Sequence, residues 1–249
     1  MPIPSKPTLV LLHGFCENHT LWDHIIPFLE YDGPIVAPDL PGFGSAPPLN
    51  KDFTLEDIAV YLHNSLTKQN VQSCVCIGHS LGGYITLSLK RSFPEFVKKI
   101  GLVHSTAFED TPEKKEGRNK LIKFLDNNPS SRFLSTFAYT LFCDTNQQRL
   151  KEDIEKVVRM SDGLSGNIIQ GYAKAMRDRK DSIDILTHEK SPLFIAGECD
   201  NSVPAESSKK QISLIENPSH CYMLENVAHM GMYEKKEAII EAIGRFIDE

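Results

Sequence analysis

Short apolar runs alternate with amphipathic stretches along this chain, and that alternation restricts the possible fold more than any other feature of the sequence. Six apolar runs have the length of buried strands, at residues 8–12, 35–37, 74–77, 100–103, 193–196 and 221–224. Apolar side chains recur at helical spacing in residues 21–29, 55–68, 81–93 and 232–247, and Pro204 with the polar run after it indicates a weaker helix through about residue 215. Strands that are apolar throughout are covered on both faces. The pattern therefore predicts an α/β fold with a doubly wound, mostly parallel sheet of about six strands.

The alternation stops after residue 103 and resumes only at residue 193, and residues 108–190 differ in character from the rest of the chain. The segment between these points holds 15 Lys and Arg and 14 Asp and Glu residues, and its apolar side chains recur at helical spacing in several stretches. We therefore predict a core formed by residues 1–107 and 191–249, and an all-helical insertion at residues 108–190. The charged cluster at residues 113–116 is interpreted as a solvated helix face.

Charge and apolar content exclude several classes of protein. The 27 Lys and Arg and 33 Asp and Glu residues give a formal net charge of −6, whereas nucleic-acid binding needs a basic surface. No apolar run approaches the ~20 residues of a membrane-spanning helix, and residues 1–7 lack the apolar core of a signal peptide. The six cysteines show no CxxC spacing, which predicts free thiols in a reducing compartment. We expect a cytoplasmic protein with no nucleic-acid or membrane partner.

Residues 78–82, GHSLG, lie directly between a predicted strand and a predicted helix. This is the context of a nucleophile elbow, a strained strand-to-helix turn that lifts a serine hydroxyl clear of the sheet. Gly78 and Gly82 would relieve crowding at such a turn. Ser80 is therefore the candidate nucleophile.

A serine hydroxyl needs a base at neutral pH, and the base needs an orienting group. Asp200 follows one late apolar run by a few residues, and His229 follows the next. Parallel strands end at a common edge of the sheet, where α/β proteins place their ligands. Ser80, His229 and Asp200 are thus predicted to form a catalytic triad. The other histidines lack metal-ligand spacing, so no metal is predicted.

The negative oxygen of a tetrahedral intermediate needs backbone N–H donors. We predict that Leu81 supplies one, because it follows the nucleophile at a helix N-terminus whose dipole favours negative charge. Phe15 is predicted to supply the second from the loop after the first run. Gly14 would let the backbone approach closely there.

Five motifs occur in order along the chain: HGF at residues 13–15, DLPGFG at 39–44, GHSLGG at 78–83, DNSVP at 200–204 and ENVAHM at 225–230. Together they resemble the α/β-hydrolase superfamily, in the branch of small serine esterases and carbon–carbon bond hydrolases with a helical cap. The resemblance covers nearly the whole chain outside the insertion and includes the family's order of Ser, Asp and His. It implies an α/β-hydrolase fold in which the insertion is a cap over the active site.

The sequence departs from the family pattern at three points. Ala228 stands before His229, where glycine is usual, and this affects only the local backbone conformation. Few residues precede the first apolar run, so the usual N-terminal antiparallel hairpin is not expected and the sheet should be all-parallel. Related epoxide hydrolases and haloalkane dehalogenases carry an aspartate nucleophile. Ser80 therefore argues against both of those activities.

The triad and the resemblance imply hydrolysis of carboxylic esters through an acyl-enzyme on Ser80, with no cofactor and with a small-molecule ester and water as partners. Small or medium esters are favoured, because the insertion contributes many apolar side chains and the sequence offers no obvious charged anchor for a phosphate or a nucleotide. The same triad also serves carbon–carbon or thioester hydrolysis, acyltransfer and cofactor-free peroxidation. A non-catalytic ligand-binding receptor is the alternative of another class. The natural substrate and the oligomeric state are left open.

Four further residues are predicted to line the substrate pocket. His104 follows the run at residues 100–103, and Met230 follows the candidate base. Phe137 and Phe142 belong to an aromatic stripe of the insertion. His79, within the elbow, is expected to have a structural role.

Overall fold

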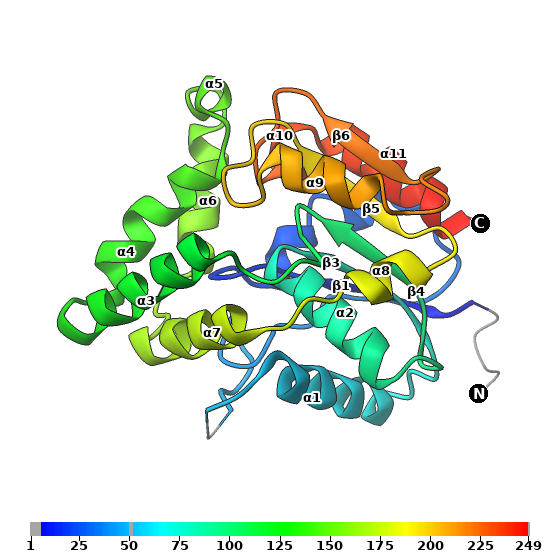
Figure 1. The fold of residues 1–249 in the computed structure, drawn as a ribbon, viewed down its shortest axis with the longest axis horizontal. Helices are drawn as coiled ribbons and strands as arrows, with labels where there is room; N and C mark the ends of the chain where they lie inside the picture. Colours follow the sequence, from blue (N-terminus) through cyan, green and yellow to red (C-terminus); the bar gives the residue numbers. More distant parts are fainter. Residues whose placement is uncertain (1–5, 50–51, 249) are drawn as a thin grey trace.

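A computed structural model describes residues 6–49 and 52–248 of the chain. Six strands form one sheet in the order β2-β1-β3-β4-β5-β6, and every neighbouring pair is parallel (Figure 1). The strands are β1 (Thr8–Leu12), β2 (Ile35–Val36), β3 (Cys74–His79), β4 (Val97–Val103), β5 (Leu193–Gly197) and β6 (Cys221–Leu224). The predicted class and the all-parallel sheet are confirmed.

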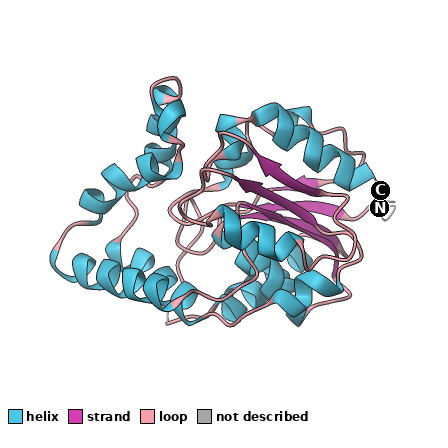
Figure 2. Ribbon diagram, turned by 45° about the horizontal axis from the view of Figure 1, so that its top comes forward, coloured by secondary structure: helices cyan, strands magenta, loops and turns pink. Residues whose placement is uncertain are grey.

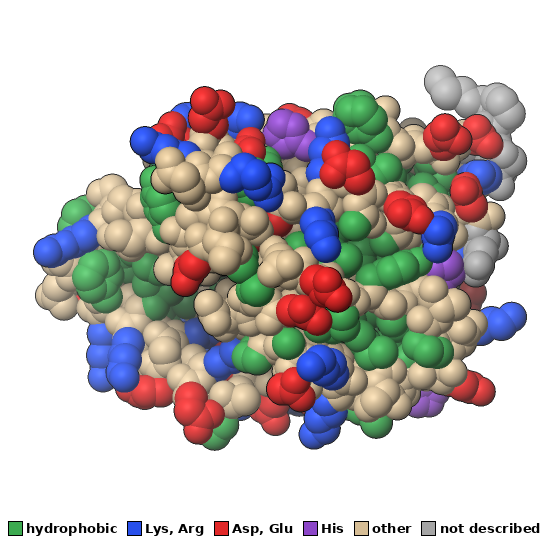
Figure 3. Space-filling view, turned by 90° about the horizontal axis from the view of Figure 1, so that it is seen from above, with side chains coloured by type: hydrophobic (Ala, Val, Ile, Leu, Met, Phe, Trp, Pro, Cys, Tyr) green, Lys and Arg blue, Asp and Glu red, His purple; other side chains and the backbone are tan. Residues whose placement is uncertain are grey.

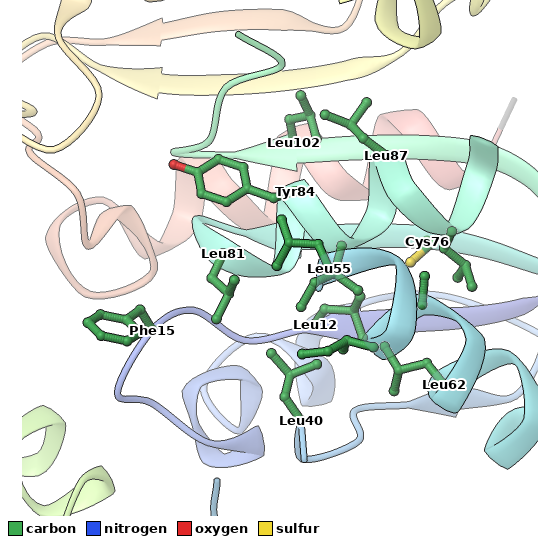
Figure 4. Close-up of a cluster of buried hydrophobic side chains, with 14 of the residues drawn as sticks. Leu12, Phe15, Leu40, Leu55, Leu62, Cys76, Leu81, Tyr84, Leu87 and Leu102 are labelled. Atoms are coloured by element: carbon green, nitrogen blue, oxygen red, sulfur yellow. The ribbon is translucent and has the colours of Figure 1, made fainter. Parts of the chain in front are cut away.

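The two faces of the sheet are buried under different helices, because successive side chains of a strand point to opposite sides. Leu9 and Leu11 of β1 pack in a cluster with side chains of the 3-10 helix η1 (His19–Trp22) and of α11 (Lys236–Asp248). Val10 and Leu12 pack on the other face with α1 (Leu55–Lys68) and α2 (Leu81–Ser92). Figure 2 shows the sheet between these helices, and Figure 4 shows the second cluster. A sheet covered on both faces leaves its strand ends for chemistry.

Two helix predictions were wrong. Residues 21–29 form two short 3-10 helices, η1 and η2 (Ile26–Phe28), instead of one α-helix. Pro27 accounts for the loss of a continuous α-helix, because it has no amide hydrogen to donate to the carbonyl of Asp23 four residues earlier. Residues 232–247 are likewise divided, into α10 (Gly231–Glu234) and α11, where Lys235 adopts φ −144° and ψ 59°.

Between β4 and β5, the described residues form helices and no strand. These are α3 (Pro112–Asn127), α4 (Ser130–Phe137), the 3-10 helix η3 (Ala138–Leu141), α5 (Asp144–Gln147), α6 (Lys151–Met160), α7 (Gly166–Asp178) and α8 (Ile183–His188). Helices α3 to α7 form a group at one end of the sheet, and α8 lies against α2 (Figures 1 and 2). The bidentate ion pair between Arg91 and Asp184 joins α8 to α2.

The remaining core helix, α9 (Ala205–Ile212), follows β5. Charged side chains of both signs are scattered over the face shown in Figure 3, with apolar side chains between them. No helix in the described part of the chain is long and apolar enough to cross a bilayer. All six cysteines are free thiols, as predicted.

Candidate active site

Ser80 lies at the turn between the last residue of β3 and the first residue of α2. Its backbone has φ 50° and ψ −115°, in a region that residues other than glycine rarely adopt. A Cβ atom on Gly78 would lie 2.1 Å from the carbonyl carbon of Gly82, and one on Gly82 would lie 2.6 Å from the Leu12 carbonyl oxygen. The turn is therefore possible only with glycine at both positions. The Ser105 hydroxyl donates to the Ser80 carbonyl at 2.7 Å and fixes the turn from outside.

Asp200 and His229, which lie on the loops after β5 and β6, are in direct contact. The Nδ1 atom of His229 donates to Oδ2 of Asp200 at 2.7 Å. The other carboxylate oxygen, Oδ1, accepts the backbone N–H groups of Ser202 at 2.7 Å and Val203 at 2.9 Å. Burial opposes ionisation of Asp200, but the His229 imidazole outweighs it and holds the pKa of the carboxyl well below its usual range. An ionised Asp200 thus keeps the hydrogen on Nδ1 and leaves Nε2 as the acceptor.

Ser80 and His229 line the same cavity, which has a volume of about 350 Å³. Six side chains give this cavity its apolar wall: Phe15, Leu121, Phe133, Phe137, Leu141 and Met176. The rings of Phe15 and Phe137 meet edge to face, with centroids 5.9 Å apart. The cavity therefore lies between the carboxyl ends of the strands and the insertion.

The two predicted oxyanion donors come from different segments, Leu81 from the start of α2 and Phe15 from the loop after β1. Leu81 is the first residue of α2, so its N–H belongs to the unpaired first turn of that helix. Phe15 lines the cavity and follows Gly14. A Cβ atom on Gly14 would lie 2.7 Å from Oε2 of Glu17 and 2.8 Å from Nδ1 of His79. Gly14 is thus required by a close approach of side chains to this loop.

Three of the four expected pocket residues do not line the cavity. Phe142 is 2% exposed and packs near Tyr233, with ring centroids 6.1 Å apart. Met230 is fully buried in the same cluster, on the face of the sheet opposite α1. His104 is fully buried behind the triad, with Nδ1 3.7 Å from Oδ2 of Asp200. Of the four, only Phe137 reaches the cavity.

His104 is a neutral histidine enclosed by other titratable groups. Its ring lies 6.1 Å from the rings of both His79 and His229, and neither of its nitrogens has a hydrogen-bond partner among the described residues. Burial lowers its pKa to about 4, although Asp200 acts in the opposite direction. His104 is therefore unprotonated at neutral pH. It is fully buried and does not line the cavity, so it is not placed to act as a second base on a substrate.

This burial predicts a loss of stability in acid. In the unfolded chain, His104 takes up a proton as the pH falls through its ordinary pKa of 6.5. In the folded protein it does so only near pH 4. Stability present above pH 6.5 is therefore lost as the pH falls toward 4, by about 3 kcal/mol from this group. Urea unfolding at pH 7, 5 and 4 measures the loss.

The His104→Asn variant isolates the contribution of His104, because asparagine tolerates the positive φ of 47° at this position. As the pH is lowered from 7 to 4, the free energy of unfolding of this variant should decrease less than that of the wild type. Equal slopes for the two proteins would show that His104 titrates normally in the folded state.

A buried Glu17–His79 pair, which the sequence did not reveal, connects the loop after β1 to the turn that holds Ser80. Oε2 of Glu17 accepts the Gly14 N–H at 2.6 Å and Nδ1–H of His79 at 3.0 Å. Nε2 of His79 donates to the carbonyl oxygen of His229 at 2.9 Å. Burial opposes both charges, but the partners outweigh it, so the pKa of Glu17 is lowered and that of His79 is raised. His79 has the structural role expected of it, as one half of an ion pair.

Another buried acid, Glu234, connects the loop after β6, which holds His229, to the insertion. Its Oε1 accepts the N–H of Cys143 at 2.8 Å and the side-chain amide of Asn146 at 2.9 Å, while Oε2 accepts the N–H of Ala228 at 2.8 Å. The N–H of His229 itself donates to the Leu141 carbonyl at 2.9 Å. The position of His229 thus depends on residues of the insertion.

The chain belongs to the α/β-hydrolase-fold family, whose model matches residues 7–236. An uncharacterized hydrolase of Bacillus subtilis (strain 168), YugF, is 26% identical over 264 residues, covering 98% of this chain and 91% of that protein. A thermophilic esterase of Thermogutta terrifontis, solved with malate bound, has a TM-score of 0.87 at 24% identity, covering 97% of this chain and 89% of the esterase. Epoxide hydrolase 4 of Mus musculus is 27% identical over 140 residues, covering 54% of this chain and 35% of that protein. Esterases and epoxide hydrolases are thus both among its relatives.

Proposed function

We propose that the protein is a serine hydrolase that cleaves small or medium carboxylic esters through an acyl-enzyme on Ser80. The observation that carries this proposal is the 2.7 Å contact between Asp200 and His229, together with the cavity that His229 shares with Ser80. An oriented imidazole that shares a cavity with a strained serine is the arrangement that activates a hydroxyl for attack on a carbonyl.

In the first half of the reaction, Nε2 of His229 takes the hydroxyl proton as Ser80 Oγ bonds to the ester carbonyl carbon. The negative oxygen that forms is bound by the N–H groups of Phe15 and Leu81. Nε2 then returns the proton to the alcohol oxygen as the carbon–oxygen bond breaks. Water repeats the sequence on the acyl-enzyme, and the carboxylic acid leaves.

The identity of the nucleophile favours an esterase over an epoxide hydrolase. Epoxide opening by a covalent route needs a carboxylate nucleophile that forms an ester with the substrate. Ser80 occupies the elbow here, and the ionised carboxylate of Asp200 is engaged by His229 and by two backbone N–H groups. The aromatic and aliphatic wall of the cavity suits the hydrocarbon part of an ester.

A fluorophosphonate probe and a panel of para-nitrophenyl esters test this proposal. We expect stoichiometric labelling of Ser80, located by peptide mass spectrometry, and multiple turnovers of at least one short or medium ester. Labelling without turnover would favour the ligand-binding alternative. An unlabelled Ser80 in folded protein would remove it from the role of nucleophile.

We further propose that the insertion acts as a cap that selects the substrate. The Phe137→Ala variant should change the preference for acyl-chain length, with an effect on kcat/KM of about 1–3 kcal/mol, because its ring lines the cavity. Ester hydrolysis across a series of acyl lengths measures this change.

Phe142→Ala is the matched control from the same aromatic stripe. This ring is buried away from the cavity, so its loss should lower the free energy of unfolding by about 3–5 kcal/mol without shifting the chain-length profile. A profile shifted equally by both variants would contradict the assignment of Phe137 to the cavity wall.

A further inference from the structure

The cavity around Ser80 has a cationic side opposite its aromatic wall. Lys114 and Arg118 are one turn apart on α3, and both line the cavity that contains Ser80 and His229. Lys114 Nζ donates to the Ser202 carbonyl at 2.6 Å, next to the loop that carries Asp200. Lys114 is therefore directed into the site and is not part of the solvated face expected for residues 113–116.

The charge of Arg118 is not balanced by its partner. Asp110 is buried and accepts from Nε of Arg118 at 2.5 Å and from Nη1 of Arg179 at 2.7 Å. Arg179 is itself buried over the Tyr84 ring, and it also donates to the carbonyl of Phe108. One carboxylate thus faces two guanidinium groups. Among the described residues, Arg118 bonds to Asp110 alone, through Nε, which leaves its terminal nitrogens for a ligand.

The acids near the cavity are already compensated. Glu17 lines the cavity, but His79 pairs with it and the Gly14 N–H binds the same oxygen. Asp200 is bound by His229 and by backbone N–H groups. Lys114 and Arg118 therefore carry the surplus charge of the site. Both side chains are half-buried beside an apolar wall, where an anionic partner would stabilise their charge.

From this surplus we infer that the substrate is an ester that also bears a carboxylate, held by Lys114 and Arg118 while its hydrocarbon part lies on the aromatic wall. The inference rests on the proposed function and narrows its substrate class. A guanidinium with free terminal nitrogens suits a planar carboxylate, and the ammonium of Lys114 adds a point charge. A cavity of about 350 Å³ limits the substrate to a small molecule.

Two pairs of esters test the inference, one for each side of the scissile bond. Para-nitrophenyl hemiadipate is compared with the hexanoate, which has the same acyl length without the charge. Acetoxybutanoate is compared with butyl acetate for the alcohol side. We expect at least one pair to favour the carboxylate by roughly 10- to 100-fold in kcat/KM, chiefly through KM, with a preference that declines as salt is added.

The Lys114→Gln/Arg118→Gln double variant should reduce this preference at least tenfold. Lys115→Gln is the matched control, because Lys115 is the neighbouring lysine of α3, pairs with Glu109 at 2.6 Å and does not line the cavity. It should leave the preference unchanged. Loss of the Arg118 bond to Asp110 could unfold the double variant, so Lys114→Gln alone, with an expected loss of severalfold, keeps the test decisive.

Binding separates failure of this inference from failure of the proposed function. Titration calorimetry on Ser80→Ala with adipate and with hexanamide measures anion preference without turnover. If neutral esters are hydrolysed and neither carboxylate-bearing ester is preferred over its neutral counterpart, this inference is wrong and the proposed esterase activity is unaffected. Tight adipate binding that depends on Lys114, without hydrolysis of any ester, would overturn the esterase and leave the anion site. If the wild type and Lys114→Gln prefer the carboxylate-bearing ester over its neutral counterpart to the same extent, the inference is also wrong.

Discussion

The Ser80→Ala variant is expected to lose ester hydrolysis by about 10⁶-fold in kcat, the loss seen when one member of a cooperating triad is removed. The hydroxyl oxygen is the atom that becomes acylated in the proposed reaction. Ser80 lines the cavity with His229 and lies in the strained turn directly before α2. Single-turnover and steady-state assays on purified variant measure the loss.

Ser88→Ala provides the control for Ser80→Ala. Ser88 lies on the same helix, two turns further on, and is buried outside the cavity. This variant should retain wild-type turnover, and circular dichroism should report folded protein for both. If the verified Ser80→Ala protein kept more than a few per cent of the activity, the assignment of the nucleophile would be wrong.

The Asp200→Asn variant should lower kcat on the order of 10⁴-fold with little change in fold. An asparagine keeps an oxygen for the N–H groups of Ser202 and Val203, which now bind Oδ1 at 2.7 and 2.9 Å. Its amide nitrogen would then face Nδ1 of His229 and favour the tautomer that has its hydrogen on Nε2. Such an imidazole cannot accept the serine proton.

Measuring kcat and the free energy of unfolding on the same Asp200→Asn sample separates catalysis from stability. The loss of kcat should be far larger than any loss of stability accounts for at assay temperature. A decrease of less than tenfold would mean that another acid orients His229, and Glu17, which reaches the same loop through His79, would be the first to replace.

The parts of this molecule that follow from local pattern could be predicted from the sequence. Strand periodicity located all six strands, although β4 begins at Val97, earlier than expected, because Lys98 and Lys99 interrupt the apolar run. Ser80, Asp200 and His229 each follow a strand of a parallel sheet. Their approach at one edge therefore depends on chain order alone, and no knowledge of side-chain packing was needed.

The parts that depend on distant contacts could not be predicted in this way. Glu17 and His79 are 62 residues apart, and Glu234 bonds to the backbone of Cys143 across 91 residues. Helical spacing placed Phe142 on the same stripe as Phe137. The chain becomes extended at Phe142, with φ −104° and ψ 146°, so the two rings point to different places.

The bonds of Glu234 also determine how the insertion can be exchanged. One oxygen of its carboxylate binds the backbone N–H of Ala228, directly before His229, and the other binds the backbone N–H of Cys143, at the start of α5. An insertion transplanted from a relative would shift the Leu141 carbonyl and the Cys143 backbone N–H, and so weaken two restraints on the position of His229. The whole insertion therefore cannot be exchanged without also disturbing the position of His229. A chimera that keeps residues 141–146 and replaces only α3, α4 and α7 would preserve the histidine while changing what the enzyme accepts.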